Sequence, residues 1–373
     1  MRVGKLCRLA LRFWLGLVLV LGFSSHYYSP TRRRLVHSRI LQTYDWLLMV
    51  INLVAFYAYY RYAMTYFLEG MFRRQGFVNQ LSTCNVFQQL LMTVTSTLLH
   101  LLFERQVCQT YNEVSTILEQ DLQLKEHSRF YCLAFLAKVY TFLHNFNFAL
   151  SAIMHWGLRP FNVYDLLANL YFVYNSLARD AIQVAYVLLL LNLSEALRLN
   201  GQQEHGSYSD LMKQLRTRER LLRIGRRVHR MFAWPVAIAL IHLVFFNTAT
   251  IYLGYTMFIQ KHDALGLRGR GLKMLLTVVS FLVILWDVVL LQVVCEKLLA
   301  EENQICASPK DVASSRTTYR QWEMCALRRA IRRSSPENKV LGMFRMDMRC
   351  AFALISCSLS YGIIIIQIGY IPG

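Results

Sequence analysis

The sequence predicts an all-α, polytopic membrane protein with seven transmembrane helices, a cytosolic N-terminus and an extracellular C-terminus. Three observations support this fold class. Hydrophobic residues make up 55% of the 373 residues and charged residues only 17%, which is unusual for a soluble protein. The apolar residues come in blocks long enough for helices that cross the hydrocarbon core of a bilayer. The basic residues gather at the ends of these blocks.

Residues 1–43 open the chain with eight Arg and Lys residues and no acidic residue. The apolar run 9–23 inside this segment has the form of a signal peptide, but Arg12 interrupts it and no small-residue cleavage site follows. We predict an amphipathic helix that lies against the cytosolic face of the membrane. An uncleaved additional span is the alternative.

Seven spans follow, each predicted from a continuous apolar block. They cover residues 43–62, 86–103, 130–154, 164–193, 232–258, 272–299 and 350–370. Between spans four and five, the basic stretch that starts at Ser209 meets no proline before Pro235. Span five is therefore expected to begin deep in the cytosol as one long helix with a local kink. A second cytosolic helix is predicted over 317–333.

The distribution of basic residues predicts the orientation. If the N-terminus is cytosolic, the inside segments hold 31 of the 41 Arg and Lys residues and the outside segments hold eight. Positive residues concentrate on the cytosolic side of membrane proteins. This orientation is opposite to that of a G-protein-coupled receptor, and the Asp-Arg-Tyr and Asn-Pro-x-x-Tyr motifs of that class are missing from spans three and seven.

Four charged residues lie at membrane depth, where charge is costly and often functional: Lys138, Arg179, Asp180 and Asp287. Arg179 and Asp180 are adjacent, so they point about 100° apart and are expected to need separate partners. Lys138 can pair with Asp180 or with Asp287 inside the bundle. An ion pair that holds the bundle together is the favoured interpretation, and a ligand contact is the alternative.

The outer halves of spans three to six combine aromatic and polar side chains. His242, Phe246 and Thr250 recur every four residues and form one stripe of span five. Ligand pockets are mostly apolar and aromatic, with a few polar groups, whereas ordinary packing and interfacial aromatic residues are the alternative. The candidate ligand-binding residues are Trp156, Tyr164, Asn169, His242, Phe246, Thr250, Ser280 and Trp286.

The last span carries one small and polar stripe along an otherwise apolar helix. Ser356, Ser360, Ile364 and Gln367 fall on this narrow face, together with Ala353. Lipid would leave the polar groups unsatisfied, so the stripe is expected to face either other helices or water. It is thus a packing seam or the lining of a pore shared between subunits.

The same residues resemble the C-terminal signature of insect gustatory receptors, which is Thr-Tyr, five hydrophobic residues and Gln-Phe. Ser360, Tyr361, Gln367 and Ile368 occupy its fixed positions, with Ser for Thr and Ile for Phe. Gly362 stands where a larger hydrophobic residue is usual. Residues 342–347 are similar to the Gly-x-Phe-x-x-Asp segment that often precedes the last helix of that family.

This resemblance implies a tastant-gated, non-selective cation channel subunit in the plasma membrane of a sensory neuron dendrite, assembled as a homo- or hetero-tetramer. It implies a tastant pocket in the outer bundle and a pore lined by the seventh helix, with Ile364 as a hydrophobic gate and Gln367 as a polar ring. The short chain looks like the large group associated with bitter compounds and other aversive contact cues. A transporter, or a seven-helix receptor whose last helix is only a packing seam, is the alternative.

The expected organisation is a basic N-terminal segment, a ligand-binding bundle, a cytosolic linker and a pore helix, at 1–43, 44–299, 300–349 and 350–373. Enzyme signatures such as GxGxxG, a P-loop, HExxH and GxSxG are missing from the sequence. The nine cysteines include no CxxC pair. We therefore expect no enzyme activity, cofactor or metal site. We also expect no nucleic-acid partner, because the basic residues gather at the ends of the apolar blocks. The expected partners are a tastant, monovalent and divalent cations, and membrane lipid.

Overall fold

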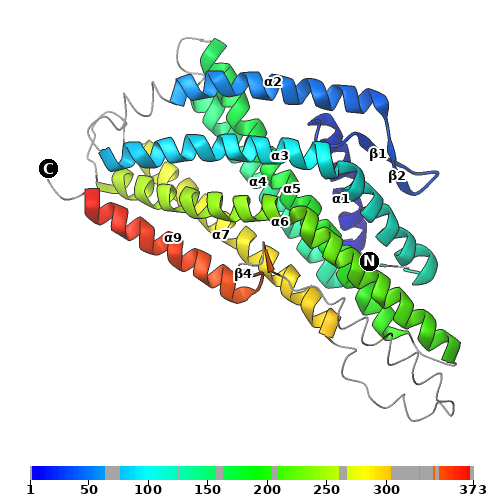
Figure 1. Ribbon diagram of the computed structural model, residues 1–373. Helices are drawn as coiled ribbons and strands as arrows, with labels where there is room; N and C mark the ends of the chain where they lie inside the picture. The colour runs from blue at the N-terminus through cyan, green and yellow to red at the C-terminus, as the bar shows by residue number, and fades with distance from the viewer. Residues whose placement is uncertain are drawn as a thin grey trace.

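The computed structural model is a bundle of long helices (Figure 1). It describes residues 2–63, 76–124, 126–156, 163–203, 208–259, 267–303, 327, 339–340 and 344–369. The α-helices within these ranges are α1 (Arg2–Val20), α2 (Arg39–Ala63), α3 (Gly76–Thr116), α4 (Arg129–Trp156), α5 (Val163–Gln202), α6 (Tyr208–Ile259), α7 (Leu267–Asn303) and α9 (Met348–Gly369). A π-helical turn, Ile117–Asp121, continues α3. Strands β1 (His26–Ser29) and β2 (Arg34–His37) form an antiparallel pair, as do β3 (Lys339–Val340) and β4 (Phe344–Arg345).

Each predicted span coincides with one helix. The first six lie within α2 to α7, and the seventh matches α9. In the part of the chain that the structure describes, α2, α3, α5, α6 and α9 contain segments long and apolar enough to cross a membrane. The helical class is confirmed, while the two short hairpins were not predicted.

The long helix predicted around span five is also confirmed. α6 is one helix of 52 residues with Pro235 inside it. Its basic N-terminal half is amphipathic, since Leu222, Ile224 and Val228 are buried between exposed arginines. Apart from Leu327, the second helix predicted over 317–333 lies outside the described residues.

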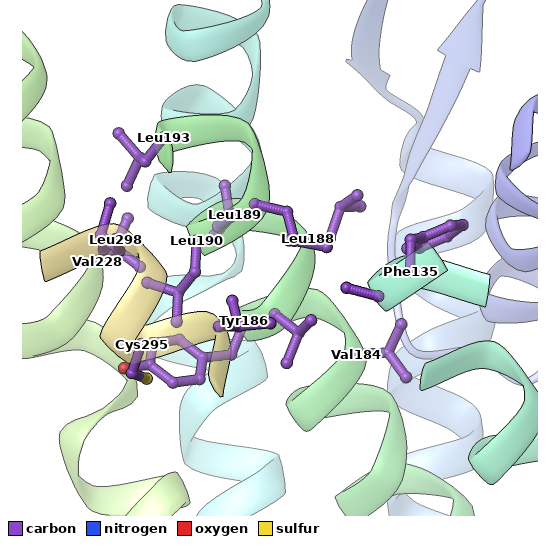
Figure 2. Close-up of a cluster of buried hydrophobic side chains, with 14 of the residues drawn as sticks. Phe135, Val184, Tyr186, Leu188, Leu189, Leu190, Leu193, Val228, Cys295 and Leu298 are labelled. Carbon is purple, nitrogen blue, oxygen red and sulfur yellow. The ribbon is translucent and has the colours of Figure 1, made fainter. Parts of the chain in front are cut away.

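α5 forms the centre of the bundle, because it packs against α2, α3, α4, α6 and α7. All residues from Tyr186 to Leu197 are buried, as expected for a helix that is apolar on all sides and has neighbours all round. Figure 2 shows part of this core, where Leu190 of α5 lies near Val228 of α6 and Leu298 of α7.

The N-terminal segment docks onto the bundle. α1 confirms the predicted helix, and its Trp14 ring meets Phe142 of α4 edge-on at a centroid distance of 4.9 Å. In the hairpin that follows, Leu35 of β2 exchanges two hydrogen bonds with the side chain of Asn112 on α3, at 2.8 and 2.9 Å. The position of α1 relative to the membrane stays a prediction.

Candidate functional site

An ion pair occupies the middle of the bundle. Lys138 Nζ of α4 lies 2.6 Å from Asp287 Oδ2 of α7, and the same amine donates to Gln183 Oε1 of α5 at 2.9 Å. Thr141 donates a further hydrogen bond to the Asp287 carboxylate at 2.7 Å. Buried charges are stable only when they are paired and hydrogen-bonded. Of the two predicted pairings for Lys138, the structure therefore selects Asp287.

The expectation that Arg179 and Asp180 need separate partners is wrong. Arg179 Nε lies 3.1 Å from Asp180 Oδ1, because the long guanidinium side chain can fold back toward the neighbouring residue. Asn145 of α4 donates to the other carboxylate oxygen of Asp180 at 2.8 Å. Both carboxylates at the centre of the bundle are thus held by α4.

A small cavity adjoins these groups. We call it the α4–α7 cavity, because its lining residues come from α4, α5, α6 and α7. Its volume is about 60 Å³. Its lining includes the charged side chains of Asp180 and Asp287 and the apolar side chains of Phe172, Leu243 and Ile284. Apolar walls with a few fixed polar groups are typical of ligand sites, and since such pockets usually measure about 300–1,000 Å³, the cavity in this conformation has room for only part of an organic ligand. Its other lining residues are Asn145, Ser176, Arg179, Gln183, Ala239 and His242.

The predicted ligand-binding residues fall into three groups. His242 is buried and lines the α4–α7 cavity. Asn169 is half-buried on α5 and Trp286 is 54% exposed on α7, and neither is among the residues that line the cavity. The backbones of the remaining five lie on α4 to α7, whereas their side chains fall outside the described part of the structure: Trp156, Tyr164, Phe246, Thr250 and Ser280.

α9 lies along the outside of the bundle against α6 and α7 (Figure 1). Its packed face consists of Ala351, Ser358, Gly362 and Ile365, all buried. At Gly362 the helices approach so closely that a Cβ atom would lie 2.8 Å from Cγ2 of Ile251. The seam within the subunit is therefore a different stripe from the one that the sequence analysis singled out.

The predicted pore stripe lies on the opposite side of α9, because a step of two residues turns a helix by about 200°. Ser360, Ile364 and Gln367 are exposed in the isolated chain and Ser356 is half-buried. Tyr361 of the family motif is also exposed. The side chain of Ile368 lies outside the described part of the structure.

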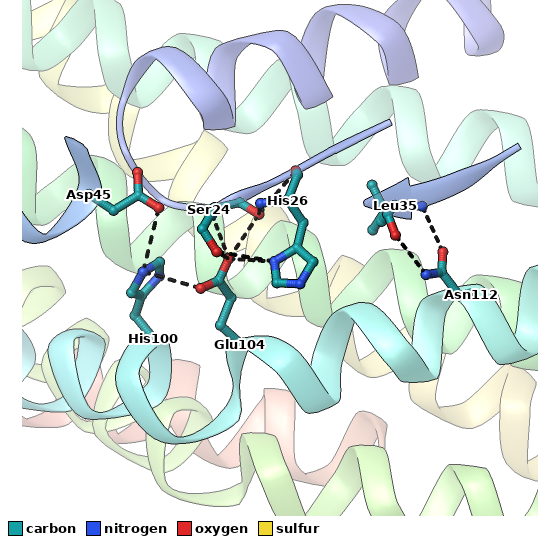
Figure 3. A network of polar contacts seen from close by, with 8 residues as sticks. Ser24, His26, Leu35, Asp45, His100, Glu104 and Asn112 are labelled. Carbon is teal, nitrogen blue, oxygen red and sulfur yellow. Dashed lines mark hydrogen bonds and ion pairs between the residues drawn. The ribbon is translucent and has the colours of Figure 1, made fainter. Parts of the chain in front are cut away.

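A second polar cluster, which was not predicted from the sequence, lies between α2, α3 and the segment that leads into β1 (Figure 3). We call Asp45, His100 and Glu104 the Glu104 cluster. His100, Glu104 and Cys108 follow one another at intervals of four residues on α3. This spacing is a signal for side chains that share one helical face, but it gives no indication that Asp45 meets them.

Comparisons with known proteins agree with one another. The family described as "7tm Chemosensory receptor" matches residues 11–371. The Drosophila melanogaster protein named "Putative gustatory receptor 10b" is 91% identical over all 373 residues, with the whole of both chains covered. The insect olfactory receptor OR5 from Machilis hrabei has a similar fold at 14% identity, with a TM-score of 0.61 over 96% of this chain and 98% of that one. The complex of the same receptor with eugenol gives a TM-score of 0.60 at 13% identity, with the same coverage.

Proposed function

Because the chain belongs to the 7tm chemosensory receptor family, among its gustatory receptors, we propose that it is a subunit of a tastant-gated, non-selective cation channel. The observation that carries this proposal is the stripe of α9, on which Ser360, Ile364 and Gln367 are exposed and Ser356 is half-buried. In one isolated copy the stripe would face lipid, where polar groups lack partners. Four copies of α9 around one axis, identical or from related subunits, would turn the stripe toward a water-filled pore.

In this assembly, two residues of the stripe form rings around the pore axis with distinct roles. Four Ile364 side chains form an apolar constriction, which can stop ions by dewetting. Four Gln367 side chains lie one turn farther out, and their amide oxygens replace part of the hydration shell of a cation. We propose that this uncharged ring admits both monovalent and divalent cations. The closed gate is thus placed at Ile364.

We place the N-terminus in the cytosol and the C-terminus outside the plasma membrane of a sensory neuron dendrite. The excess of basic residues in the segments before α2 and between α5 and α6 supports this orientation. In intact cells, an antibody should reach an epitope tag after Gly373 without permeabilisation. A tag at Met1 should become accessible only after permeabilisation, and the reverse pattern would overturn the orientation.

The tastant is proposed to bind at the α4–α7 cavity, beside the ion pair of Lys138 and Asp287. The buried His242 and the carboxylate of Asp180 supply polar contacts beside apolar walls. The eugenol complex of the Machilis hrabei receptor, whose fold is similar, supports a small organic ligand. Bitter and other aversive compounds are the stimuli that we propose to test first.

The experiment is a whole-cell current recording during a tastant screen, with the chain alone and with related gustatory receptor subunits. Once an active tastant is found, two variants of α7 locate its site. Ile284 lines the cavity and Trp286 is exposed, although sequence analysis placed Trp286 in the pocket. Ile284→Ala should raise the half-maximal tastant concentration about ten-fold, since loss of about 1.4 kcal/mol of contact has that effect.

Trp286→Ala is the matched control, because it removes a large side chain two residues away on the same helix. It should leave the dose–response curve unchanged, and both variants should reach the cell surface in normal amounts. A shift caused by Trp286→Ala but not by Ile284→Ala would contradict the placement of the tastant in the α4–α7 cavity.

A further inference from the structure

The Glu104 cluster brings three potential metal ligands together from two helices. His100 Nε2 lies 3.3 Å from Glu104 Oε2 and 3.6 Å from Asp45 Oδ2. One ligand atom from each of the three residues lies within 4.8 Å of the others. Ligands bound to one Zn²⁺ at about 2.1 Å in tetrahedral geometry are roughly 3.4 Å apart. The two distances from His100, whose contacts are drawn as dashed lines in Figure 3, are close to that spacing.

Asp45 adds an independent indication of a ligand. Its side chain is fully buried, and neither carboxylate oxygen takes part in a hydrogen bond within the described part of the chain. A buried carboxylate in this condition is costly, and the neighbouring carboxylate of Glu104 adds repulsion when both are ionised. Among the described residues, Asp45 Oδ2 has a charged contact only at 3.6 Å, with His100 Nε2, and a divalent cation would neutralise both carboxylates and bind Asp45 directly.

The surrounding residues hold the other two ligands in position. Glu104 Oε1 accepts hydrogen bonds from the backbone N–H and the hydroxyl of Ser25, at 2.5 and 2.8 Å, which leaves Oε2 directed toward His100. Glu104 in turn lies against His100, whose Nε2 is 3.3 Å from Glu104 Oε2. In metalloproteins, hydrogen bonds from neighbouring residues to the histidine and carboxylate ligands orient those ligands toward the metal.

We propose that Asp45, His100 and Glu104 bind one divalent transition-metal ion, and we choose Zn²⁺ as the probe because its usual ligands include both imidazole nitrogen and carboxylate oxygen. A cavity of about 170 Å³ is lined by both His100 and Glu104, and it has room for a water molecule as the fourth ligand. The ion joins α2 to α3 and, through Glu104, fixes the segment that leads into β1. The site therefore acts as a structural clamp on the N-terminal part of the chain.

A second set of three side chains that includes Glu104 is a weaker candidate for a metal site. His26, Glu104 and Cys108 also lie within 4.8 Å of one another. However, His26 Nδ1 already faces Glu104 Oε1 at 2.9 Å, and that oxygen also accepts the two hydrogen bonds from Ser25. An ion there would compete with all three of these contacts at Oε1, whereas neither oxygen of Asp45 takes part in a hydrogen bond within the described residues and Asp45 Oδ2 lies 3.6 Å from His100 Nε2.

The test uses the full-length protein, purified in detergent, stripped with EDTA and then equilibrated with Zn²⁺ alone. Mass spectrometry of the metal should find one ion per chain. Zn²⁺ should also raise the melting temperature, because a ligand that binds only the folded state stabilises it. Asp45→Asn and His100→Gln should each lower the bound zinc at least ten-fold at the same free concentration and abolish the shift in melting temperature.

Glu195→Gln is the matched control, since Glu195 is a buried carboxylate paired with Arg198 away from the cluster, at 2.7 Å. This variant should bind zinc normally. No zinc on the wild-type protein above the level of adventitious binding, or no effect of zinc on its melting temperature, would overturn the proposal even if the variants fail to fold. Loss of zinc in Cys108→Ser with full binding in Asp45→Asn would also overturn it, because the ion would then belong to the second group.

Discussion

At the scale of single residues, Gly362 shows how structure explains a departure from a sequence motif. The gustatory receptor signature usually has a larger hydrophobic residue at this position, and sequence analysis gave no reason for glycine. The structure supplies the reason, because Ile251 of α6 fills the space where a Cβ atom would lie. Since Ile251 is β-branched, its side chain has few alternative rotamers with which to move away.

We expect Gly362→Ala to destabilise the protein by about 1–3 kcal/mol, the usual cost of overpacking. The melting temperature of the purified protein and its delivery to the cell surface should both fall. Ile251→Ala in the same chain should restore much of the loss by removing the clashing methyl groups. Gly16→Ala is the control, because nothing lies within 4 Å of a Cβ atom added there. Equal behaviour of Gly362→Ala and Gly16→Ala would show that the close approach of α6 and α9 is not real.

At the scale of elements, the pairing of α4 with α7 was only half predictable. The sequence indicates that Lys138 needs an acidic partner at membrane depth, but Asp180 and Asp287 satisfy that requirement equally well. The choice depends on which helices lie next to each other, and this is set by packing around α5 rather than by any local pattern. Arg179 and Asp180 make the same point, since their contact depends on side-chain conformation and not on helical angle alone.

Lys138→Met should destabilise the bundle by about 3–5 kcal/mol, because it leaves the carboxylate of Asp287 buried without its counter-charge. The free energy of unfolding in detergent, followed by circular dichroism, measures this loss. The double variant Lys138→Met with Asp287→Leu should recover most of it, since an apolar pair of similar volume leaves no buried charge. A single variant as stable as the wild-type protein would mean that the two side chains are not paired.

At the scale of the whole molecule, the helices were predictable because long apolar blocks must form helices in a bilayer. The Glu104 cluster and the β1–β2 hairpin were not, since they depend on contacts between distant residues. His26 and Glu104, for example, are 78 positions apart. The candidate pore stripe of α9 could be recognised from helical spacing alone. Its position on the exposed side, opposite the seam at Gly362, required the fold.

The central claim is that this exposed stripe lines a cation pore closed by Ile364. Ile363→Ser is a matched control, because Ile363 is an exposed isoleucine on the same turn but off the stripe. Both variants should be expressed at normal surface levels, confirmed by surface labelling.

The decisive measurement is the whole-cell current without tastant. Ile364→Ser should wet the closed constriction and produce a standing cation current, whereas Ile363→Ser should remain silent like the wild-type channel. An Ile364→Ser channel that reaches the surface normally and yet passes no current without tastant would contradict the pore assignment.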